Sequence, residues 1–414
     1  MKKLFKVSAI LCFVFFIFIL TIASFESENL PVEINVTEGT TNVELNSVLP
    51  LTANIDTNKF FRIDRDTAEN DKTYKAQVKL MNIVPVKNVE VKVVEEKTVV
   101  PCGEAFGVKI FTKGVVIVGM PGVKTEQGLK NPTDLAGLKI GDAVLAIDGK
   151  EVDSNETVER LVGESAGKTL SVDAKRNDMT FNVKLNPVKC VDDNHYRAGI
   201  LVRDSSAGIG IMTFFDPDTG QFAGLGHAIC DVEIGEPLPL NHGEIVSANI
   251  SGVTKGGKGM PGELKGHFTN QNAIGTLDFN ANTGVYGRLK IKVYNEEKIP
   301  VAMKQQVRVG DAKIISTVRG EKKEEFAVRI RELNYKKNSP TKNMVVEITD
   351  PELLKITGGI VQGMSGSPLI QNGMLVGALT HVFLNDSKCG YAIFAENMLN
   401  KCKNMYKDFY DEVS

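Results

Sequence analysis

The chain lacks the sequence motifs that most directly indicate a metal-binding site. It has no H-E-x-x-H segment and no pair of cysteines separated by two residues, so the sequence gives no support to a zinc peptidase or a structural zinc site. Its formal net charge of -2 at pH 7 offers no electrostatic footprint for nucleic acid. We therefore predict no metal, no other cofactor and no DNA or RNA partner.

Cysteine is also too sparse to build a disulfide framework. Cys12 falls in the first hydrophobic segment, which leaves an odd number of cysteines scattered through the rest of the chain. We predict buried or free thiols at these five positions. They are Cys102, Cys190, Cys230, Cys389 and Cys402.

Only one long hydrophobic run is present, at the N-terminus. Three lysines among the first six residues precede an uncharged segment from Val7 to Phe25, and Glu26 follows it. The length of this run approaches the roughly 20 residues that span a bilayer. The lysine-rich N-terminal flank is expected to stay in the cytoplasm. We expect residues 1–25 to form a transmembrane anchor with the body exported, although Thr21-Ile22-Ala23 leaves cleavage of a signal peptide open.

The exported part is long enough for two or three domains. Composition is globular, with 42% hydrophobic and 24% charged residues. Residues 26–100 end in a valine-rich stretch in which apolar and polar residues alternate, which predicts half-buried strands in a stalk or small β region.

Residues 101–188 carry the signature of a bacterial PDZ domain. In "NPTDLAGLKIGDAVLAIDGKEV", the Pro132, Ala136-Gly137-Leu138 and Gly141-Asp142 positions resemble that family. A helix capped by Ser154 and a hairpin around Asn177-Asp178 are predicted after it.

A PDZ domain binds an extended peptide at an open strand edge. The segment "AFGV" has the form of the family's carboxylate-binding loop, so Phe106, Gly107, Val108 and Ile110 are the predicted peptide-binding residues. Two alternatives stay open: the segment is an ordinary strand of a packed domain, or the groove is filled in cis.

Residues 189–414 are dominated by predicted strands and glycine turns, as in an all-β peptidase. Ser365 lies in "GMSGSP", between Gly363 and Gly366, and the Asn372-Gly373 pair after it is a strong hairpin signal. An α/β-hydrolase elbow needs glycine where Ser367 stands and a helix where the hairpin follows, so that architecture is excluded.

The remaining nucleophile architecture resembles that of chymotrypsin-like peptidases, in which the histidine precedes the serine. Of the four upstream histidines, His227 in "GLGHAICD" is best placed, because it ends an apolar strand between glycines. The N–H groups of Gly363 and Ser365 are the predicted oxyanion hole. His381, downstream, belongs either to the core or to the border of the site. The residues themselves do not rank the candidate carboxylates, which are Asp231, Asp278, Asp311 and Asp350.

The motifs "LGHAICD" and "TGGIVQGMSGSPLIQNGMLVGALTHVF", together with the PDZ signature, resemble the stage IV sporulation protein B peptidase family. The resemblance implies a mainly β protein: a PDZ domain followed by a chymotrypsin-like β-barrel serine peptidase. It also implies a triad of His227, Asp350 and Ser365, although an aspartate so close before the serine is not where a standard chymotrypsin fold has it.

The same resemblance implies a biological role. Members are exported across the inner forespore membrane and face the space between forespore and mother cell. They cleave a membrane-bound regulator of an intramembrane metallopeptidase, which then processes a sigma factor. The alternative hypothesis is a non-catalytic PDZ scaffold with a degenerate peptidase domain.

Overall fold

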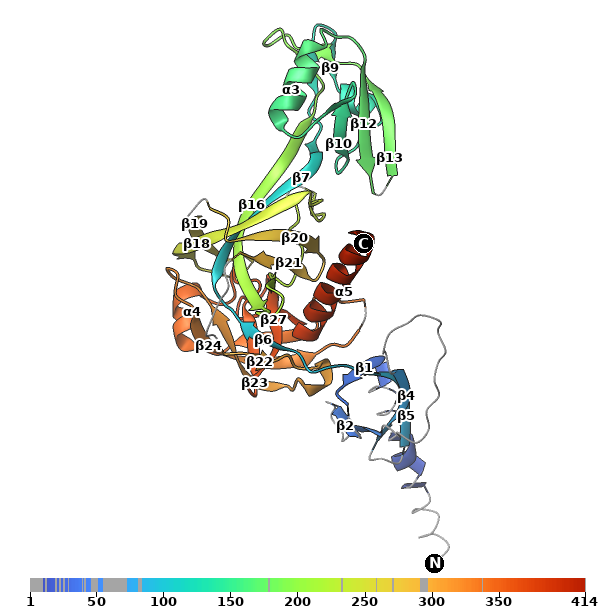
Figure 1. Ribbon diagram of the computed structural model, residues 1–414, viewed down its shortest axis with the longest axis vertical. Helices are drawn as coiled ribbons and strands as arrows, with labels where there is room; N and C mark the ends of the chain where they lie inside the picture. Colours follow the sequence, from blue (N-terminus) through green and yellow to red (C-terminus); the bar gives the residue numbers. More distant parts are fainter. Residues whose placement is uncertain are drawn as a thin grey trace, which may run out of the picture.

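The protein is elongated, with three β-rich parts arranged along its long axis (Figure 1). The computed structural model describes residues 30–413 except 39, 41, 46–50, 55–72, 81–83, 178, 232–233, 258, 270–271, 291–296 and 337, and scattered residues between 10 and 28. The predicted anchor, residues 1–25, thus lies largely outside the described residues. Within the described ones, no helix combines the length and the hydropathy of a membrane span.

The N-terminal part is a small sheet, in the region predicted as a stalk or β element. Its strand order is β1-β5-β4-β3-β2, with β1 parallel to β5. Its Asn35 amide donates to Glu396 of the C-terminal helix, which joins the sheet to the body of the protein. The strands are β1 (Glu33–Val36), β2 (Asn42–Leu45), β3 (Leu51–Asn54), β4 (Thr73–Leu80) and β5 (Val84–Val93).

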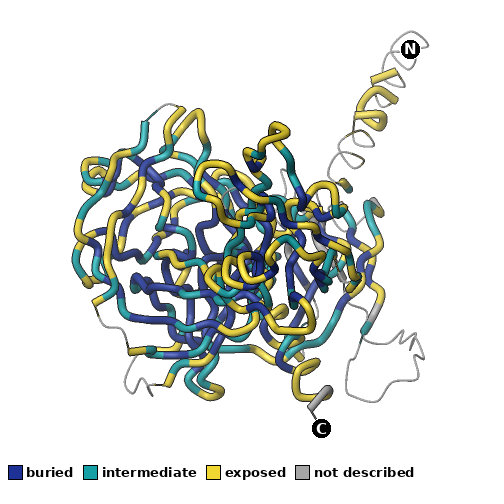
Figure 2. The backbone as a smooth tube through the Cα atoms, turned by 90° about the horizontal axis from the view of Figure 1, so that it is seen from above, coloured by how far each residue is buried: buried dark blue, intermediate teal, exposed yellow. Residues whose placement is uncertain are grey.

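The body consists of two barrels. In the first, strands β7, β18, β20, β21, β17 and β16 follow one another, and the pairing of β16 with β7 closes the ring. Buried residues gather in the interior of the molecule, and exposed ones lie mainly on its outer loops (Figure 2). The first barrel and its extensions comprise β6 (Thr98–Pro101), β7 (Ala105–Gly119), β16 (Leu201–Phe215), β17 (Gln221–Gly224), β18 (His242–Thr254), β19 (Glu263–Phe268), β20 (Gly275–Ala281), β21 (Gly284–Leu289) and β22 (Ile299–Pro300).

The second barrel closes in the order β23-β24-β25-β28-β27-β26. Its β26–β27 hairpin turns at Asn372-Gly373, as predicted, with positive φ at both residues. The elements are η1 (Lys304–Gln306), β23 (Gly310–Ser316), β24 (Glu324–Leu333), β25 (Met344–Ile348), α4 (Pro351–Thr357), β26 (Pro368–Gln371), β27 (Met374–Val382), β28 (Cys389–Phe394) and α5 (Ala395–Val413).

The PDZ domain is inserted between two strands of the first barrel. Strands β7 and β16 leave the barrel as a long ribbon and carry the domain at its far end (Figure 1). As predicted, Ser154 caps α3 and Asn177 turns the β12–β13 hairpin. The elements are β8 (Val123–Thr125), β9 (Gly128–Lys130), α2 (Pro132–Leu135), β10 (Ala143–Ile147), β11 (Lys150–Glu151), α3 (Asn155–Glu164), β12 (Leu170–Arg176), β13 (Met179–Leu185), β14 (Val188–Lys189) and β15 (Tyr196–Arg197).

The Gly-Asp pair of the PDZ signature has a structural role. The buried Asp142 carboxylate accepts the Lys139 N–H at 2.8 Å and binds Arg176 with an N–O distance of 2.7 Å. These bonds tie the entry of β10 to the end of β12, because a buried carboxylate must be fully partnered.

The predicted peptide-binding loop of the PDZ domain is wrong. Phe106, Gly107, Val108 and Ile110 lie in the first part of β7, paired with β16 on one side and β18 on the other. The side chains of Phe106, Val108 and Ile110 are almost wholly buried in the core of the first barrel. A strand with two partners has no edge for a peptide, so these residues form part of the first barrel and offer no peptide-binding edge.

Candidate active site

Ser365 lies on a tight turn that leads into β26. The turn needs glycine at its flanks, since φ is +92° at Gly363 and +95° at Gly366. A Cβ atom on Gly366 would also lie 1.9 Å from the Ile211 carbonyl oxygen, which no side chain tolerates. The glycines recognised in the sequence are thus required by both conformation and space.

The turn is fastened to the opposite barrel by its backbone. The Ile211 N–H donates to the Ser365 carbonyl at 3.0 Å, and the Thr213 hydroxyl donates to the Gly366 carbonyl at 2.8 Å. Both donors come from β16. The serine of the second barrel is therefore held in place by the first.

Two backbone N–H groups beside the serine have no acceptor within the described part of the chain. These belong to Gly363 and Ser365, whereas the neighbouring Met364 N–H donates to the Val361 carbonyl at 3.1 Å. Unpaired N–H groups that flank a nucleophile are the arrangement that an oxyanion hole requires.

His227 follows β17, just after two residues with positive φ, Leu225 and Gly226. Its Nδ1 lies 2.8 Å from the Ala228 carbonyl oxygen. Because a carbonyl can only accept, Nδ1 carries the proton and Nε2 is left as the basic nitrogen. Burial lowers the pKa of His227 below its ordinary value, so the ring is neutral at neutral pH.

The histidine loop is anchored by a residue from a distant strand. The Asn280 side chain on β20 accepts the Ile229 N–H at 2.8 Å and donates to the carbonyls of Ile229 and Leu238 at 2.9 and 3.0 Å. One amide group thus fixes both ends of the loop 229–238, which begins two residues after His227.

Ser365 and His227 line one cavity of about 640 Å³ between the barrels. The Ser365 hydroxyl donates to the Thr380 carbonyl at 2.8 Å, and the rings of His227 and His381 are 5.0 Å apart between centroids. Among the described residues that line this cavity, none is Asp, Glu, Lys or Arg. The site is therefore a serine beside two histidines in uncharged surroundings.

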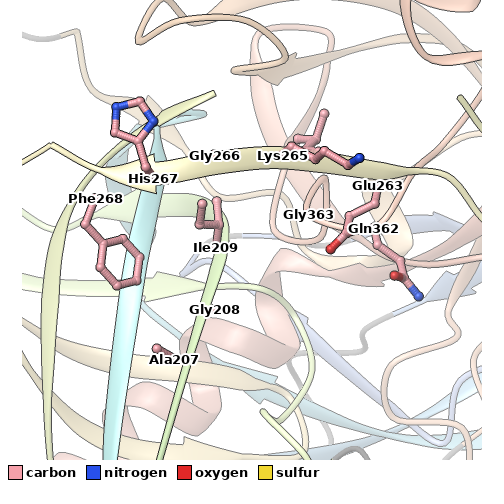
Figure 3. Close-up of a pocket in the computed structure, with 11 residues that line it drawn as sticks. Ala207, Gly208, Ile209, Glu263, Lys265, Gly266, His267, Phe268, Gln362 and Gly363 are labelled. Carbon is pink, nitrogen blue, oxygen red and sulfur yellow. The ribbon is translucent and has the colours of Figure 1, made fainter. Parts of the chain in front are cut away.

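A second cavity of about 560 Å³ adjoins the first and shares Ala207, Gly208, Ile209, Gln362 and Gly363 with it. Figure 3 shows strand β19 crossing over β16 here, with Phe268 near one end and Gly363 near the other. The two cavities together form a continuous depression along β16.

Asp350 is not among the residues that line either cavity. It is the N-cap of α4, and its carboxylate accepts N–H groups from Glu352 at 2.9 Å, Leu353 at 3.0 Å and Ala327 at 3.2 Å. The ring nitrogen that it was expected to orient bonds the Ala228 carbonyl instead. In this structure Asp350 is a helix cap.

The other candidate carboxylates are engaged elsewhere. Asp231 is buried and pairs with Arg203 at 2.8 Å, Asp278 binds Arg288 at 2.8 Å, and Asp311 pairs with Arg329. None of them lines the described part of the catalytic cavity.

Two cavity residues had little or no signal in the sequence. Cys230 was predicted only as a buried or free thiol, and it is an exposed free thiol that lines the cavity. His381, for which core and site were both left open, lines the cavity, and desolvation, the neighbouring His227 and Lys342 lower its pKa to about 4. The only available signal was the position of His381 on the strand after the serine hairpin.

Comparison with known families agrees with this geometry. The SpoIVB peptidase S55 family model matches residues 194–399, and a PDZ family model matches residues 108–186. The chain belongs to the SpoIVB peptidase family. It is therefore a serine peptidase with a PDZ domain, and the first strand of its catalytic barrel, β7, precedes the matched peptidase segment.

Solved structures resemble parts of this SpoIVB-family peptidase. The PDZ domain of the SdrC-like protein from Listeria monocytogenes is 20% identical, covering 22% of this chain and 87% of that one, with a TM-score of 0.18. The Rv3671c protease from M. tuberculosis is 13% identical in its active form, covering 47% and 72%, with a TM-score of 0.29. Its inactive form is 14% identical, covering 47% and 83%, also with a TM-score of 0.29. No curated protein matches the chain.

Proposed function

We propose that the chain is a signalling endopeptidase in which Ser365 is the nucleophile and His227 the general base. The observation that carries the proposal is that these two residues come from different barrels and line one cavity. The unpaired N–H groups of Gly363 and Ser365 would receive the developing oxyanion.

The reaction begins with a rotation of the Ser365 side chain. Its hydroxyl leaves the Thr380 carbonyl, turns toward Nε2 of His227 and attacks the substrate carbonyl as Nε2 takes the proton. His227 then donates this proton to the leaving amine, the peptide bond breaks, and an acyl-enzyme remains. Water attacks the ester by the same route and releases the new carboxylate.

The group that orients the imidazole is the Ala228 carbonyl, which already holds Nδ1 at 2.8 Å. A carbonyl fixes the ring and its tautomer but carries no charge to stabilise the imidazolium that forms. The role of Asp350 as a charged partner of the ring stays a prediction, and it would require the carboxylate to leave the cap of α4.

The uncharged cavity indicates the class of peptide that is cleaved. No Asp, Glu, Lys or Arg lines the described part of the cavity that contains Ser365. A charged side chain bound there beside the cleaved bond would lose hydration without gaining a charged partner. We expect cleavage between uncharged, mainly apolar residues of a protein substrate.

Family membership supports a role in sporulation. In this proposal the N-terminal hydrophobic run anchors the protein in the forespore membrane, and the body faces the space between forespore and mother cell. The substrate is a membrane-bound regulator that inhibits an intramembrane metallopeptidase. Cleavage of the regulator relieves this inhibition, and the metallopeptidase then processes a sigma factor. The PDZ domain binds a peptide, in cis or on the substrate.

The test compares wild type with Ser365→Ala. We expect the purified wild type to cleave itself or the unfolded protein β-casein, and the variant to leave both intact. In sporulating cells, the variant should accumulate the unprocessed sigma factor. Equal behaviour of both proteins in both assays would instead support the scaffold hypothesis.

A further inference from the structure

Strand β27 carries a β-bulge beside the turn that holds the nucleophile. Leu379 is bonded to that turn through both its N–H and its carbonyl. On the other side of the strand, Leu379 pairs with Ala392 and His381 pairs with Tyr391, so Thr380 is an extra residue in the ladder. Bulges are frequent next to active sites, where they redirect a side chain.

The bulge brings two consecutive residues against both halves of the catalytic site. The Thr380 carbonyl accepts the Ser365 hydroxyl at 2.8 Å, and the ring of His381 lies 5.0 Å from the ring of His227 between centroids, at an angle of 38°. Thr380 and His381 both line the catalytic cavity. The Thr380 hydroxyl donates to the Thr341 carbonyl at 3.0 Å, which holds the bulge in place.

The imidazole of His227 needs more than its hydrogen bond to keep a fixed direction. Within the described part of the chain that bond runs from Nδ1 to the Ala228 carbonyl. One bond leaves the ring free to tilt, because the χ2 torsion of histidine is broad, and a tilt displaces Nε2 from the serine. No carboxylate lines the described part of the cavity. The ring of His381, within the contact range of aromatic pairs, supplies a second contact.

The ring of His381 is suited to this place because it is uncharged. Desolvation, His227 and Lys342 lower the pKa of His381 to about 4, and its cross-strand neighbour on β28 is Tyr391. A cation at this position would repel the imidazolium that forms on His227 during the reaction. A neutral ring packs against His227 without that penalty.

We propose that His381 is a positioning residue of the peptidase: the bulge at Thr380 sets its uncharged ring against His227, and this contact keeps Nε2 directed at Ser365. The inference deepens the proposed function and rests on Ser365 and His227 acting as nucleophile and base. His381 acts through the ring of His227 and not on the reacting atoms.

The first test removes the ring and then restores it. In cleavage of β-casein, His381→Ala should lower kcat about 10- to 100-fold, because a tilted base is misplaced, and should change KM less than about 3-fold. His381→Phe again supplies a ring and should recover kcat to within about 3-fold of wild type. The control is His242→Ala, whose ring stacks on Phe111 at 4.5 Å and does not line the cavity. Its kcat should stay within about 2-fold of wild type.

The pH profile separates positioning from a merely structural role. The ring of His381 shields His227 from water, so in His381→Ala the pKa of His227 should rise toward 6.5, its ordinary value. The acid midpoint of kcat/KM should then move up by at least about 0.5 pH unit. His381→Phe keeps the shield and should keep the wild-type midpoint. A lower kcat of His381→Ala with an unchanged midpoint overturns the proposal, and so does a phenylalanine variant as slow as the alanine variant.

Ser365→Ala, measured in parallel, distinguishes this inference from the proposed function. If Ser365→Ala abolishes cleavage while His381→Ala keeps the wild-type kcat and acid midpoint, only the role of His381 is refuted. If Ser365→Ala still cleaves, both proposals are refuted. Should His381→Ala not fold, His381→Gln, which keeps a polar side chain but no ring, is judged by the same criteria.

Discussion

The turn that carries Ser365 and the loop that carries His227 form the two halves of the site, and they are held in different ways. The serine turn is shaped by its own glycines and locked by backbone bonds to β16. The loop that follows His227 is held by one side chain from another strand, Asn280. The conformation of the serine turn is thus specified by its own glycines and its position by bonds to β16, whereas the segment after His227 has a long-range side-chain anchor.

We expect the largest loss of activity from His227→Ala, which removes the base from the histidine half of the site. Without the base, kcat/KM should fall at least about 10,000-fold, while the midpoint of thermal unfolding stays close to that of the wild type. Steady-state cleavage of β-casein measures the first and calorimetry the second. A loss below 10-fold would remove His227 from the mechanism.

Local specification of the serine turn is tested by Gly366→Ala. The added Cβ meets the Ile211 carbonyl, and φ of +95° is strained for alanine, so we expect a loss of about 3 kcal/mol in the free energy of unfolding. The matched control is Gly373→Ala, with φ of +75° and open space around it, which should cost about 1 kcal/mol. Equal costs in urea unfolding would show that the close approach at Gly366 does not matter.

The long-range anchor of the histidine is tested by Asn280→Ala. Loss of its three hydrogen bonds should lower kcat about 10- to 100-fold, because the loop no longer fixes the ring, and should destabilise the protein by about 1–3 kcal/mol. Asn249→Ala, whose amide makes only a long bond to Glu321, is the control. If both variants keep wild-type kcat, the loop is held by other contacts.

Substitutions of Asp350 distinguish a helix-capping role from a catalytic role of its carboxylate. Asp350→Ala should lower the free energy of unfolding by about 1 kcal/mol, and Asp350→Ser, which keeps a capping oxygen, should recover most of it. The kcat of the serine variant separates the roles: a value within 10-fold of wild type leaves only the cap. A loss of about 10,000-fold would mean that the carboxylate reaches the imidazole during turnover.

The smallest predicted effect is a shift in pH dependence. Since burial lowers the folded-state pKa of His227, the acid limb of kcat/KM should have its midpoint below 6.5, the ordinary value. Stability follows the same sign: the unfolded histidine binds a proton first, so stability is complete above pH 6.5 and is lost as pH falls toward the folded-state pKa. For His381 that window runs from about 6.5 to about 4, and His381→Asn should reduce the loss. An acid midpoint above 6.5 would contradict the assignment of a buried neutral base.

The local features were predictable from the sequence because neighbouring residues encode them. The serine turn, the Asn372-Gly373 hairpin and the Ser154 cap each follow from residue types at short spacing. The placement of the PDZ domain was not predictable in this way. "AFGV" fits a carboxylate-binding loop and a barrel strand equally well, and only the pairing of β7 with β16 and β18 decides between them.

The group that orients the imidazole could not be predicted from the sequence either. Every residue has a backbone carbonyl, so the role of the Ala228 carbonyl leaves no mark in the sequence. An aspartate near the serine, in contrast, is readily identified as a candidate. The contacts of Asn280 likewise join residues 51 positions apart, beyond the reach of a local pattern.

The most direct test of the account is covalent labelling with a small phosphonate that reacts with activated serines. Intact-mass and peptide analysis should find one adduct per chain, on Ser365, in the wild type. His227→Ala should form it at least about 1,000-fold more slowly, because Nε2 no longer takes the proton. An adduct on another serine, or an equal labelling rate without His227, would contradict the central claim that these two residues act together.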